Sequence, residues 1–421
     1  MVVAVQRAVR GRGVAIVLLL TLSGCGGGAG AGTTATGTAA TGDRRPDTDA
    51  RDDAGAVAAG HWEQLAASPA GPGAGPLLVW DGRELLQLGG VSGPVRRAAG
   101  STADGPARPD VAAFSPVSGR WTRLDPAPFP VASGPGTTAT WTGTQVIVLS
   151  PQGGASFTPS SGRWHRIAPP PVTALTSPEA VWSGGRLVLA VTLRPPDRQP
   201  RTEVAGYDPA ADRWTRRDPP RVTGHDRRGG PLVDTPDGAV LFSLWSHDSR
   251  AGGVEGGVDV QRLAPDGRWT TLDAGWPQHE TVGGPLLTDV GVVVPAGQLW
   301  CGDCSHPAPS NEHGYLADPH TLRGRAMTRG PLDDTDPREL WTGRALIALS
   351  QAEITGPGLS IVPGDVAAWD PVADRWARAT RSPTALDYRT LPVWGAHRLF
   401  AIDARGRTVT LVPAAPAASP G

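Results

Sequence analysis

The chain has 421 residues and a formal net charge of −1, and it contains 56 Gly, 43 Pro and 15 Trp. All 39 basic residues are Arg, because the sequence contains no Lys, which excludes Walker-type phosphate loops and Schiff-base lysine chemistry. This nearly neutral balance also lacks the basic face that a nucleic-acid partner requires, so no nucleic acid is expected to bind.

The first 24 residues have the pattern of an export signal. Three Arg residues precede an apolar run over 14–22, which is too short to span a bilayer but fits a signal-peptide core. The run ends in Leu-Ser-Gly-Cys, which resembles the bacterial lipoprotein box and predicts Cys25 as the acylated first residue of the mature protein. An ordinary secretory signal with an incidental Cys is the alternative. Two acyl chains on Cys25 would hold the protein at the extracytoplasmic face of the bacterial cell membrane.

Residues 25–60 are rich in Gly, Ala, Thr and Asp and contain little that a folded domain could bury. Such a composition predicts a disordered tether, with a root-mean-square reach of about 30–35 Å. At the other end of the chain, residues 414–421 predict a flexible tail.

A short phrase recurs along the rest of the sequence. It is YDPAADRW over 207–214 and WDPVADRW over 369–376. Its Pro stops strand pairing, and the Gly or Asp before the Arg suits a positive φ, so the phrase predicts a hairpin whose Trp begins the return strand. The copies end at Trp121, Trp164, Trp214, Trp269 and Trp376, and a further copy has Gly324 in place of Trp.

A second phrase alternates with the first and consists of two β-rich runs around a tight, Gly-containing turn. It predicts a second hairpin. Its seven copies are centred on Trp80, Trp141, Trp182, Asp234, Thr288, Trp341 and Trp394. Because 11 of the 15 Trp residues occupy two repeat positions, they are expected to pack between sheets and not to stack on sugars.

The two hairpins together form a unit that repeats every 43 to 59 residues. Four-stranded units of this length are typical of propeller blades, so the sequence predicts an all-β, seven-bladed β-propeller over 61–413. The last unit provides only three strands, of which 407–413 is the third. Residues 61–69 resemble a fourth strand, so the N-terminal strand is predicted to complete the seventh blade and close the ring.

These repeats resemble those of kelch-type propellers, of the galactose-oxidase-like kind found in exported bacterial proteins. The family repeat has a Gly-Gly doublet after its second strand, an aromatic residue on its third and a Trp at the start of its fourth. The aromatic position matches at Phe114, Phe157, Tyr207 and Trp369, and the Trp position at six places that include Trp62. The doublet matches only at Gly89-Gly90, and the resemblance covers residues 61–413.

The resemblance implies either of two functions, because kelch-like propellers include both binding proteins and carbohydrate-active enzymes such as lyases and sugar isomerases. Galactose oxidase chemistry itself is not expected, since it requires a Tyr cross-linked to a Cys, and two of the three Tyr residues, Tyr207 and Tyr315, lie on repeat strands. The sequence has neither a G-x-S-x-G elbow nor an H-E-x-x-H zinc motif. No catalytic residue, cofactor or metal is therefore predicted, and a binding protein is favoured over an enzyme.

Cys301 and Cys304 lie in a loop segment that also contains His306, His313 and His320. Export favours a local disulfide between the two Cys residues. A zinc or copper site of thiolates and imidazoles is one alternative, and an unpaired or redox role is another. The Asp-rich segment 332–339 fits no calcium cage, so a solvated acidic loop is expected there.

Function is expected in the loops, because the strands use their side chains for packing. Turns 1–2 and 3–4 of each blade open on one face of the ring and are tight. Loops 2–3 and the links between blades open on the other face, and many are long and varied. This asymmetry is typical of a recognition surface, although tolerated insertions are an alternative interpretation.

The residues just before each innermost strand are predicted to surround the axial opening on the face with the long loops. Six of them carry charge or can gain it: Glu179, Arg228, His279, Glu280, Arg338 and Arg389. Arg suits carboxylates or sulfates, whereas Glu and His suit sugar hydroxyls or proton transfer. These groups could instead only solvate the channel mouth. The sequence thus predicts a monomer that binds an extracellular protein or glycan at this opening.

Overall fold

The computed structural model describes residues 53–92, 105–134, 136–176, 178–193, 201–221, 227–228, 230–248, 254–275, 284–295, 314–332, 337–350, 354–355, 360–361, 364–387 and 389–415. In these ranges one short helix, α1 (Ala54–Ala58), accompanies strands β1 to β31. No helix of this part of the chain is long and apolar enough to cross a membrane.

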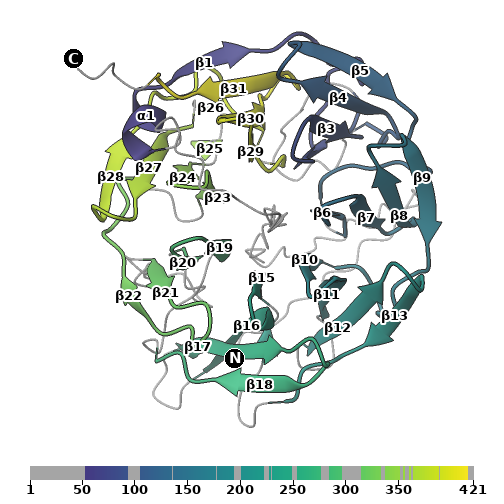
Figure 1. Cartoon of the computed structure of the whole chain (residues 1–421), viewed down its shortest axis with the longest axis vertical. Helices are drawn as coiled ribbons and strands as arrows, with labels where there is room; N and C mark the ends of the chain where they lie inside the picture. The colour runs from purple at the N-terminus through teal and green to yellow at the C-terminus, as the bar shows by residue number, and fades with distance from the viewer. Residues whose placement is uncertain are drawn as a thin grey trace, which may run out of the picture. The chain divides into compact units, whose positions relative to one another are not determined.

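Seven antiparallel sheets follow one another around a ring (Figure 1), and each is a blade with its first strand innermost. Blade 1 consists of β2 (Leu77–Trp80), β3 (Leu85–Leu88), β4 (Val111–Ser115) and β5 (Arg120–Leu124); blade 2 of β6 (Thr138–Trp141), β7 (Val146–Ser150), β8 (Gly153–Thr158) and β9 (Arg163–Ile167); blade 3 of β10 (Glu179–Ser183), β11 (Arg186–Leu193), β12 (Arg201–Asp208) and β13 (Arg213–Arg216).

Blade 4 consists of β14 (Arg227–Arg228), β15 (Leu232–Thr235), β16 (Gly238–Asp248), β17 (Val254–Leu263) and β18 (Trp269–Leu272); blade 5 of β19 (Leu286–Thr288), β20 (Gly291–Val294), β21 (Tyr315–Ala317) and β22 (Gly324–Ala326); blade 6 of β23 (Arg338–Trp341), β24 (Leu346–Leu349), β27 (Val366–Asp370) and β28 (Arg375–Arg378); blade 7 of β29 (Val393–Gly395), β30 (Arg398–Ile402), β31 (Thr408–Val412) and β1 (His61–Gln64). The seven-bladed β-propeller predicted from the repeats is confirmed.

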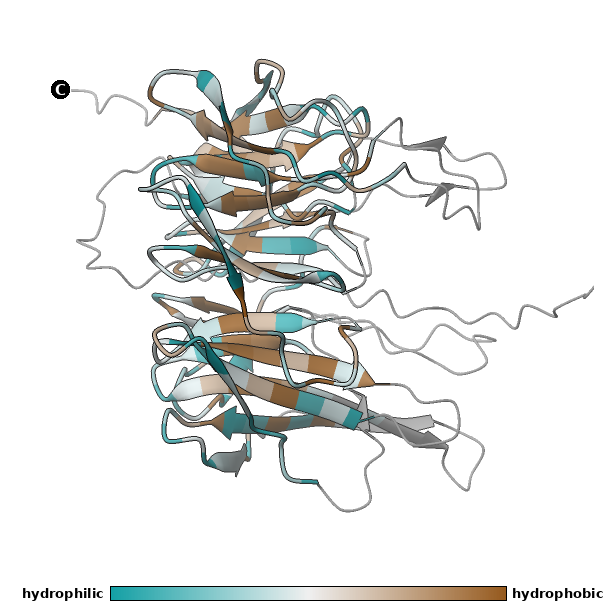
Figure 2. Ribbon diagram, turned by 90° about the vertical axis from the view of Figure 1, so that its right-hand side faces the viewer, coloured by the Kyte–Doolittle hydropathy of each residue, from teal (hydrophilic) through white to brown (hydrophobic). Residues whose placement is uncertain are grey.

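The inner strands of each blade are buried on both faces, because a neighbouring blade packs on either side. β3 and β7 are buried at every position, and their sequences are runs of Leu, Val and Ile with few polar residues. The outermost strands alternate instead, as in β5, because one of their faces is exposed to solvent. Figure 2 shows this contrast as apolar inner strands within a more polar perimeter. The core is therefore a ring of apolar layers between blades.

The N-terminal strand closes the ring, as predicted. β1 pairs antiparallel with β31, with Trp62 opposite Leu411, so the first strand in the sequence completes the last blade. Trp62 packs against the apolar cluster between blades 6 and 7, and its indole N–H donates to the carbonyl of Thr380 at 2.9 Å. Closure pairs an edge that β31 would otherwise expose.

The same contact repeats around the ring. In six blades the Trp of the outermost strand donates its indole N–H to a carbonyl just after the outermost strand of the preceding blade. These pairs are Trp62–Thr380 (2.9 Å), Trp121–Ala66 (3.0 Å), Trp164–Asp125 (3.1 Å), Trp214–Ala168 (2.7 Å), Trp269–Arg217 (2.8 Å) and Trp376–Thr328 (2.8 Å). The predicted packing role of these Trp residues thus includes a hydrogen bond between blades.

Blade 5 makes this contact without a Trp. Its Arg323 donates Nε to the Asp273 carbonyl at 3.1 Å and Nη2 to the Asp273 carboxylate at 2.7 Å. A side chain at Gly324 would place its Cβ 2.3 Å from the carbonyl oxygen of Leu316. The residue before Gly324 therefore provides the link, and all seven blade interfaces carry one.

The ordered chain begins earlier than the predicted boundary at residue 61. Helix α1 lies within the segment predicted as a tether, but Val57 is fully buried in the cluster between blades 6 and 7. Asp53 caps the helix by accepting the N–H of Ala56 at 2.6 Å, and Ala414 donates its N–H to the carbonyl of Ala56 at 2.9 Å. Residues 53–60 are thus part of the propeller, and residues 25–52 lie outside the described ranges.

Two blades depart from the four-stranded plan on the face with the long loops. In blade 4, β14 and β15 both pair with β16, so this sheet has five strands. β16 and β17 extend over 11 and 10 residues and form a raised hairpin. In blade 6 the connection between β24 and β27 contains a separate hairpin, β25 (Ile354–Thr355) paired with β26 (Ser360–Ile361).

Candidate functional site

Chain direction gives the two ends of the ring different connections. Turns between first and second strands and between third and fourth strands are short, and we call this end the tight-turn face. The connections between second and third strands open at the other end, the long-loop face, together with the links between blades. On the long-loop face β16, β17 and the β25–β26 hairpin project beyond the rest of the fold (Figure 2, right). Only β7–β8 and β30–β31 are joined there by short connections.

The innermost strands contact one another in sequence around the axis, from β2 through β6, β10, β15, β19 and β23 to β29 and back to β2. Each of these strands begins on the long-loop face. The side chains at their first residues therefore surround the axial opening at that end. This is the candidate site.

The structure places three of the predicted residues at this opening. Glu179 begins β10 opposite Ala190, and it is 8% exposed. Arg338 begins β23 opposite Leu349, and Arg389 lies in the link that leads into β29. A ligand-binding role for the three side chains stays a prediction.

The other predicted residues do not all fall at this position. Arg228 lies on β14 opposite Leu244, on the extra strand of blade 4 and not at the start of its innermost strand β15. The link into blade 4 was expected to be a loop, but it pairs with the extension of β16. His279, Glu280, Cys25, Cys301 and Cys304 lie outside the described residues, so the predicted disulfide and lipidation stay predictions.

A chain of hydrogen bonds fixes the mouth near Arg389. Asp387 is 3% exposed and accepts the N–H of Gly75 at 2.6 Å. The carbonyl of Gly75 accepts the N–H of Ser133 at 2.6 Å, and the Ser133 hydroxyl donates to the carbonyl of Arg389. The links into β29, β2 and β6 are therefore joined, which makes this side of the mouth rigid. Sequence reasoning identified Arg389 but not its support, because the three segments are far apart in the chain.

Arg338 is available for a ligand. Its side chain is half-buried, and it has no hydrogen-bond or ion-pair partner in the described ranges. Its Nε is fully buried and points at no acceptor. Since a guanidinium has five N–H donors and buried donors are normally satisfied, Arg338 can donate to an acidic or hydroxyl-rich ligand at the opening.

The buried carboxylate of Glu203, which sequence reasoning missed, holds another link on the long-loop face. It is 1% exposed and accepts the N–H of Thr173 at 2.7 Å and the Thr173 hydroxyl at 2.9 Å, with Arg216 at 2.9 Å. Burial alone would raise the pKa of Glu203, but the hydrogen bonds from Thr173 and Arg216 hold this pKa below its ordinary value. A carboxylate saturated in this way is structural. Its position within an apolar β-run was the available sequence signal.

Asp234 occupies a repeat position that holds Trp in five other blades. Burial raises the pKa of Asp234 to about 6, although hydrogen bonds from the Ser183 hydroxyl and the backbone of Thr235 oppose the shift. The folded state therefore binds this proton more tightly than the unfolded chain, whose Asp has an ordinary pKa of 3.8. The carboxyl costs the fold nothing below pH 3.8 and its full amount above pH 6.

Replacement of Asp234 by Asn is thus expected to stabilise the protein by roughly 2 kcal/mol at pH 8 and to change nothing at pH 3.5. Urea denaturation at the two pH values measures the effect, and Asp266→Asn, at an exposed turn carboxylate, is the matched control. A gain that is equal at both pH values would contradict the raised pKa.

The described residues contain no group of three or more His, Cys, Asp or Glu side chains that could hold a metal ion. The His and Cys residues of the predicted metal alternative lie mostly in 296–313, outside the described ranges.

No protein-family model matches the chain, and no curated protein matches it either. Its structure matches 485 chains of solved structures. One of them, titled "Structure of YjhT", is 11% identical with a TM-score of 0.46, and the match covers 75% of this chain and 99% of that one. At this distance the propeller assignment depends on the strand pairing itself.

Proposed function

We propose that this protein is a lipid-anchored, kelch-type, galactose-oxidase-like propeller that binds an extracellular protein or a glycan on its long-loop face. The observation that supports the proposal is the unequal construction of the two faces. Tight turns leave little side chain to vary at one end. Long connections in five blades, with the raised β16–β17 and β25–β26 hairpins, provide a varied surface at the other.

The axial opening adds a chemical preference to this surface. Arg338 has unused donors, and Arg389 lies on a hydrogen-bonded, rigid link. An acidic group on the ligand suits both guanidinium groups, because a carboxylate or sulfate accepts two parallel hydrogen bonds from one Arg. Rigid support reduces the entropy lost on binding.

The test is a glycan-array and surface pull-down screen with the full-length protein, followed by affinity measurement for the ligand found. Arg338→Ala and Arg389→Ala are each expected to weaken binding of an acidic ligand by about 1–3 kcal/mol, with little change in melting temperature. Arg163→Ala is the matched control, since Arg163 is exposed at the start of β9 near the tight-turn face.

Two other outcomes would redirect the proposal. If both Arg variants bind as the parent does while deletion of residues 89–110 abolishes binding, recognition occurs on the rim and not at the axis. If the protein converts a bound saccharide and Glu179→Gln abolishes turnover, the protein is a carbohydrate-active enzyme of the lyase or isomerase kind. The buried carboxyl of Glu179 is the described group best suited to proton transfer there.

Anchoring is tested separately. Cys25→Ser is expected to release the protein from the membrane fraction or to leave the signal peptide unprocessed, because the acylated thiol is lost. Detergent-phase partitioning measures the change, and Cys301→Ser, which lies far from the lipoprotein box in sequence, is the control. Partitioning of Cys25→Ser that equals the parent's would reject lipidation.

A further inference from the structure

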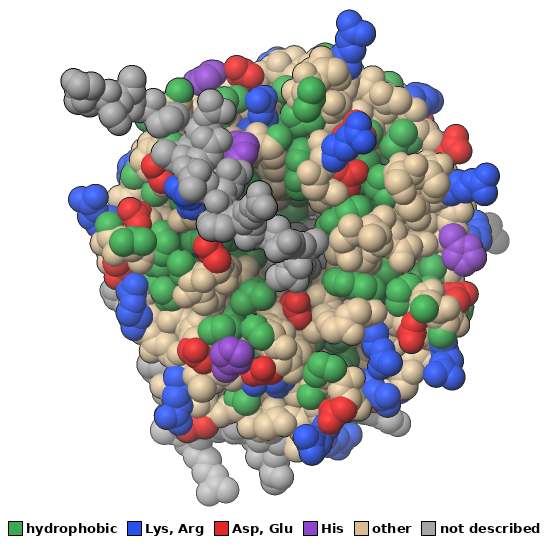
Figure 3. All heavy atoms as spheres, viewed as in Figure 1, with side chains coloured by type: hydrophobic (Ala, Val, Ile, Leu, Met, Phe, Trp, Pro, Cys, Tyr) green, Lys and Arg blue, Asp and Glu red, His purple; other side chains and the backbone are tan. Residues whose placement is uncertain are grey.

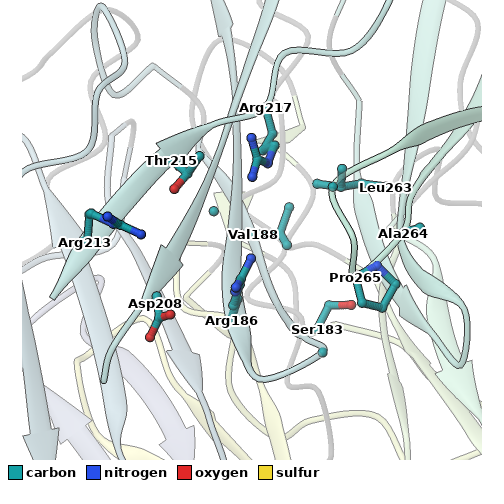
Figure 4. Close-up of a pocket in the computed structure, with 13 residues that line it drawn as sticks. Ser183, Arg186, Val188, Asp208, Arg213, Thr215, Arg217, Leu263, Ala264 and Pro265 are labelled. Carbon is teal, nitrogen blue, oxygen red and sulfur yellow. The ribbon is translucent and has the colours of Figure 1, made fainter. Parts of the chain in front are cut away.

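A cavity opens between blades 3 and 4 on the tight-turn face, at the opposite end of the ring from the candidate site. It has a volume of about 120 Å³. Figure 4 shows its walls: strands β11 to β13 of blade 3 on one side, and Leu263 with Pro265 from the third-to-fourth turn of blade 4 on the other. Three arginines, Arg186, Arg213 and Arg217, line the blade 3 side.

Arg217 is the residue that departs from the repeat. It follows the Trp of the outermost strand at a position where the other six blades carry apolar side chains. Those residues are Leu65, Leu124, Ile167, Leu272, Met327 and Ala379. Arg217 is half-buried, and a Cβ on Gly267 of blade 4 would lie 2.8 Å from its Nε. The glycine thus makes room for a cation in an otherwise apolar position.

The corresponding gap between blades 4 and 5 is filled. Arg262 on β17 spans it, with Nη2 donating to the carbonyls of Pro319 at 3.1 Å and His320 at 2.6 Å, and with Nη1 3.1 Å from the Asp237 carboxylate. The equivalent residue in blade 3 is Gly206, opposite Val188 as Arg262 is opposite Val240. A Cβ on Gly206 would have no atom within 4 Å. The missing side chain leaves the cavity open.

The charge in the cavity is not balanced within the protein. None of the three arginines has a hydrogen-bond or ion-pair partner among the described residues, whereas Arg216 on the same strand is paired with Glu203 and Asp218. Asp208 also lines the cavity, but its carboxylate accepts the N–H groups of Ala210 at 3.0 Å and Ala211 at 3.3 Å within its own turn. Three cations against one anion leave an excess of positive charge.

We propose that this cavity binds a phosphate or sulfate group. Three guanidinium groups on separate positions of blade 3 suit an anion whose oxygens point in several directions, whereas a planar carboxylate is satisfied by one Arg fork. The volume equals that of about four water molecules, which accommodates one such group but not an attached polymer. The bound group provides the countercharge that Asp237 gives Arg262 in the next interface. The site is independent of the function proposed for the long-loop face.

Titration calorimetry of the full-length protein at low ionic strength, with inorganic phosphate and with sulfate, tests the proposal. One molecule per chain is expected to bind, and Arg217→Leu, which restores the residue type of the other blades, is expected to weaken binding at least tenfold. Arg163→Leu is the matched control, because Arg163 has the repeat position of Arg213 in blade 2 but no cavity beside it, and it should bind as the parent does. Melting temperatures confirm that each variant is folded.

Gly206→Val gives a second test, because it fills the gap without removing a cation, and it is also expected to weaken binding at least tenfold. Glycerol 1-phosphate that binds more tightly than inorganic phosphate would identify a phosphate ester as the ligand, and equal affinity would identify the free anion. The proposal is overturned if neither phosphate nor sulfate binds, if Arg217→Leu and Gly206→Val both bind as the parent does, or if acetate binds more tightly than phosphate.

Discussion

Removal of residues 53–64 is expected to destabilise the protein by about 5 kcal/mol or more, which equals the whole stability of many domains. The deletion removes the Trp62 side chain, the buried Val57 of α1 and the entire β1 ladder on β31. It leaves β31 as an exposed edge, so aggregation should accompany unfolding. Circular dichroism melts and light scattering measure both effects.

Two controls separate closure from the loss of any N-terminal segment. Deletion of 12 residues from within 26–52 should leave the melting temperature unchanged, because this stretch precedes the ordered chain. A synthetic peptide of residues 53–66, added to the truncated protein, should restore part of the lost stability by pairing with β31. A truncated protein that melts like the parent would show that blade 7 is stable with three strands.

The second large effect concerns the tryptophans that join the blades. Trp164→Ala is expected to cost about 2–4 kcal/mol, because it empties the space against Phe157, whose ring centre lies 5.0 Å away, and frees the Asp125 carbonyl. Trp164→Phe should cost about 1 kcal/mol, since it retains most of the packing and loses only the hydrogen bond.

Arg323→Ala is the matched comparison in the blade that lacks the Trp. Its side chain is 65% exposed and its Asp273 partner 81% exposed, so the loss should be at most about 1 kcal/mol. Urea denaturation of the three variants gives the ranking. If Arg323→Ala costs as much as Trp164→Ala, then the hydrogen bond and not ring packing stabilises the blade interfaces.

The fold was predictable because its signals are local and repeated. A Pro, a turn residue and a Trp mark each outer hairpin, and a single weak copy such as the one at Gly324 is recognisable from the others. Helix α1 was not predictable, because Ala and Gly around Val57 have the composition of a linker. Only the apolar surface of blades 6 and 7 makes the burial of Val57 favourable.

The candidate site was predictable only in outline. The strand order placed Glu179, Arg338 and Arg389 at one end of the ring, but not Asp387, whose contact with Gly75 joins segments from opposite ends of the sequence. Arg228 was misplaced, because a two-residue strand beside a Gly-Gly-Pro sequence gives no periodic signal. Arg217 did give a signal, a charge in an apolar repeat position, but its meaning depends on Gly206 and Gly267 in three dimensions.

Ring closure by β1 has a mechanical consequence for a protein attached through Cys25. Any pull between a captured ligand and the membrane would reach the propeller through α1 and β1, since no other described segment lies between the anchor and the blades. The load would fall first on the four residue pairs that join β1 to β31, from His61–Val412 to Gln64–Val409. Force along the strand would shear these pairs together, whereas force across it would peel them in turn. The seam that completes the ring is thus also the place where tension would open it.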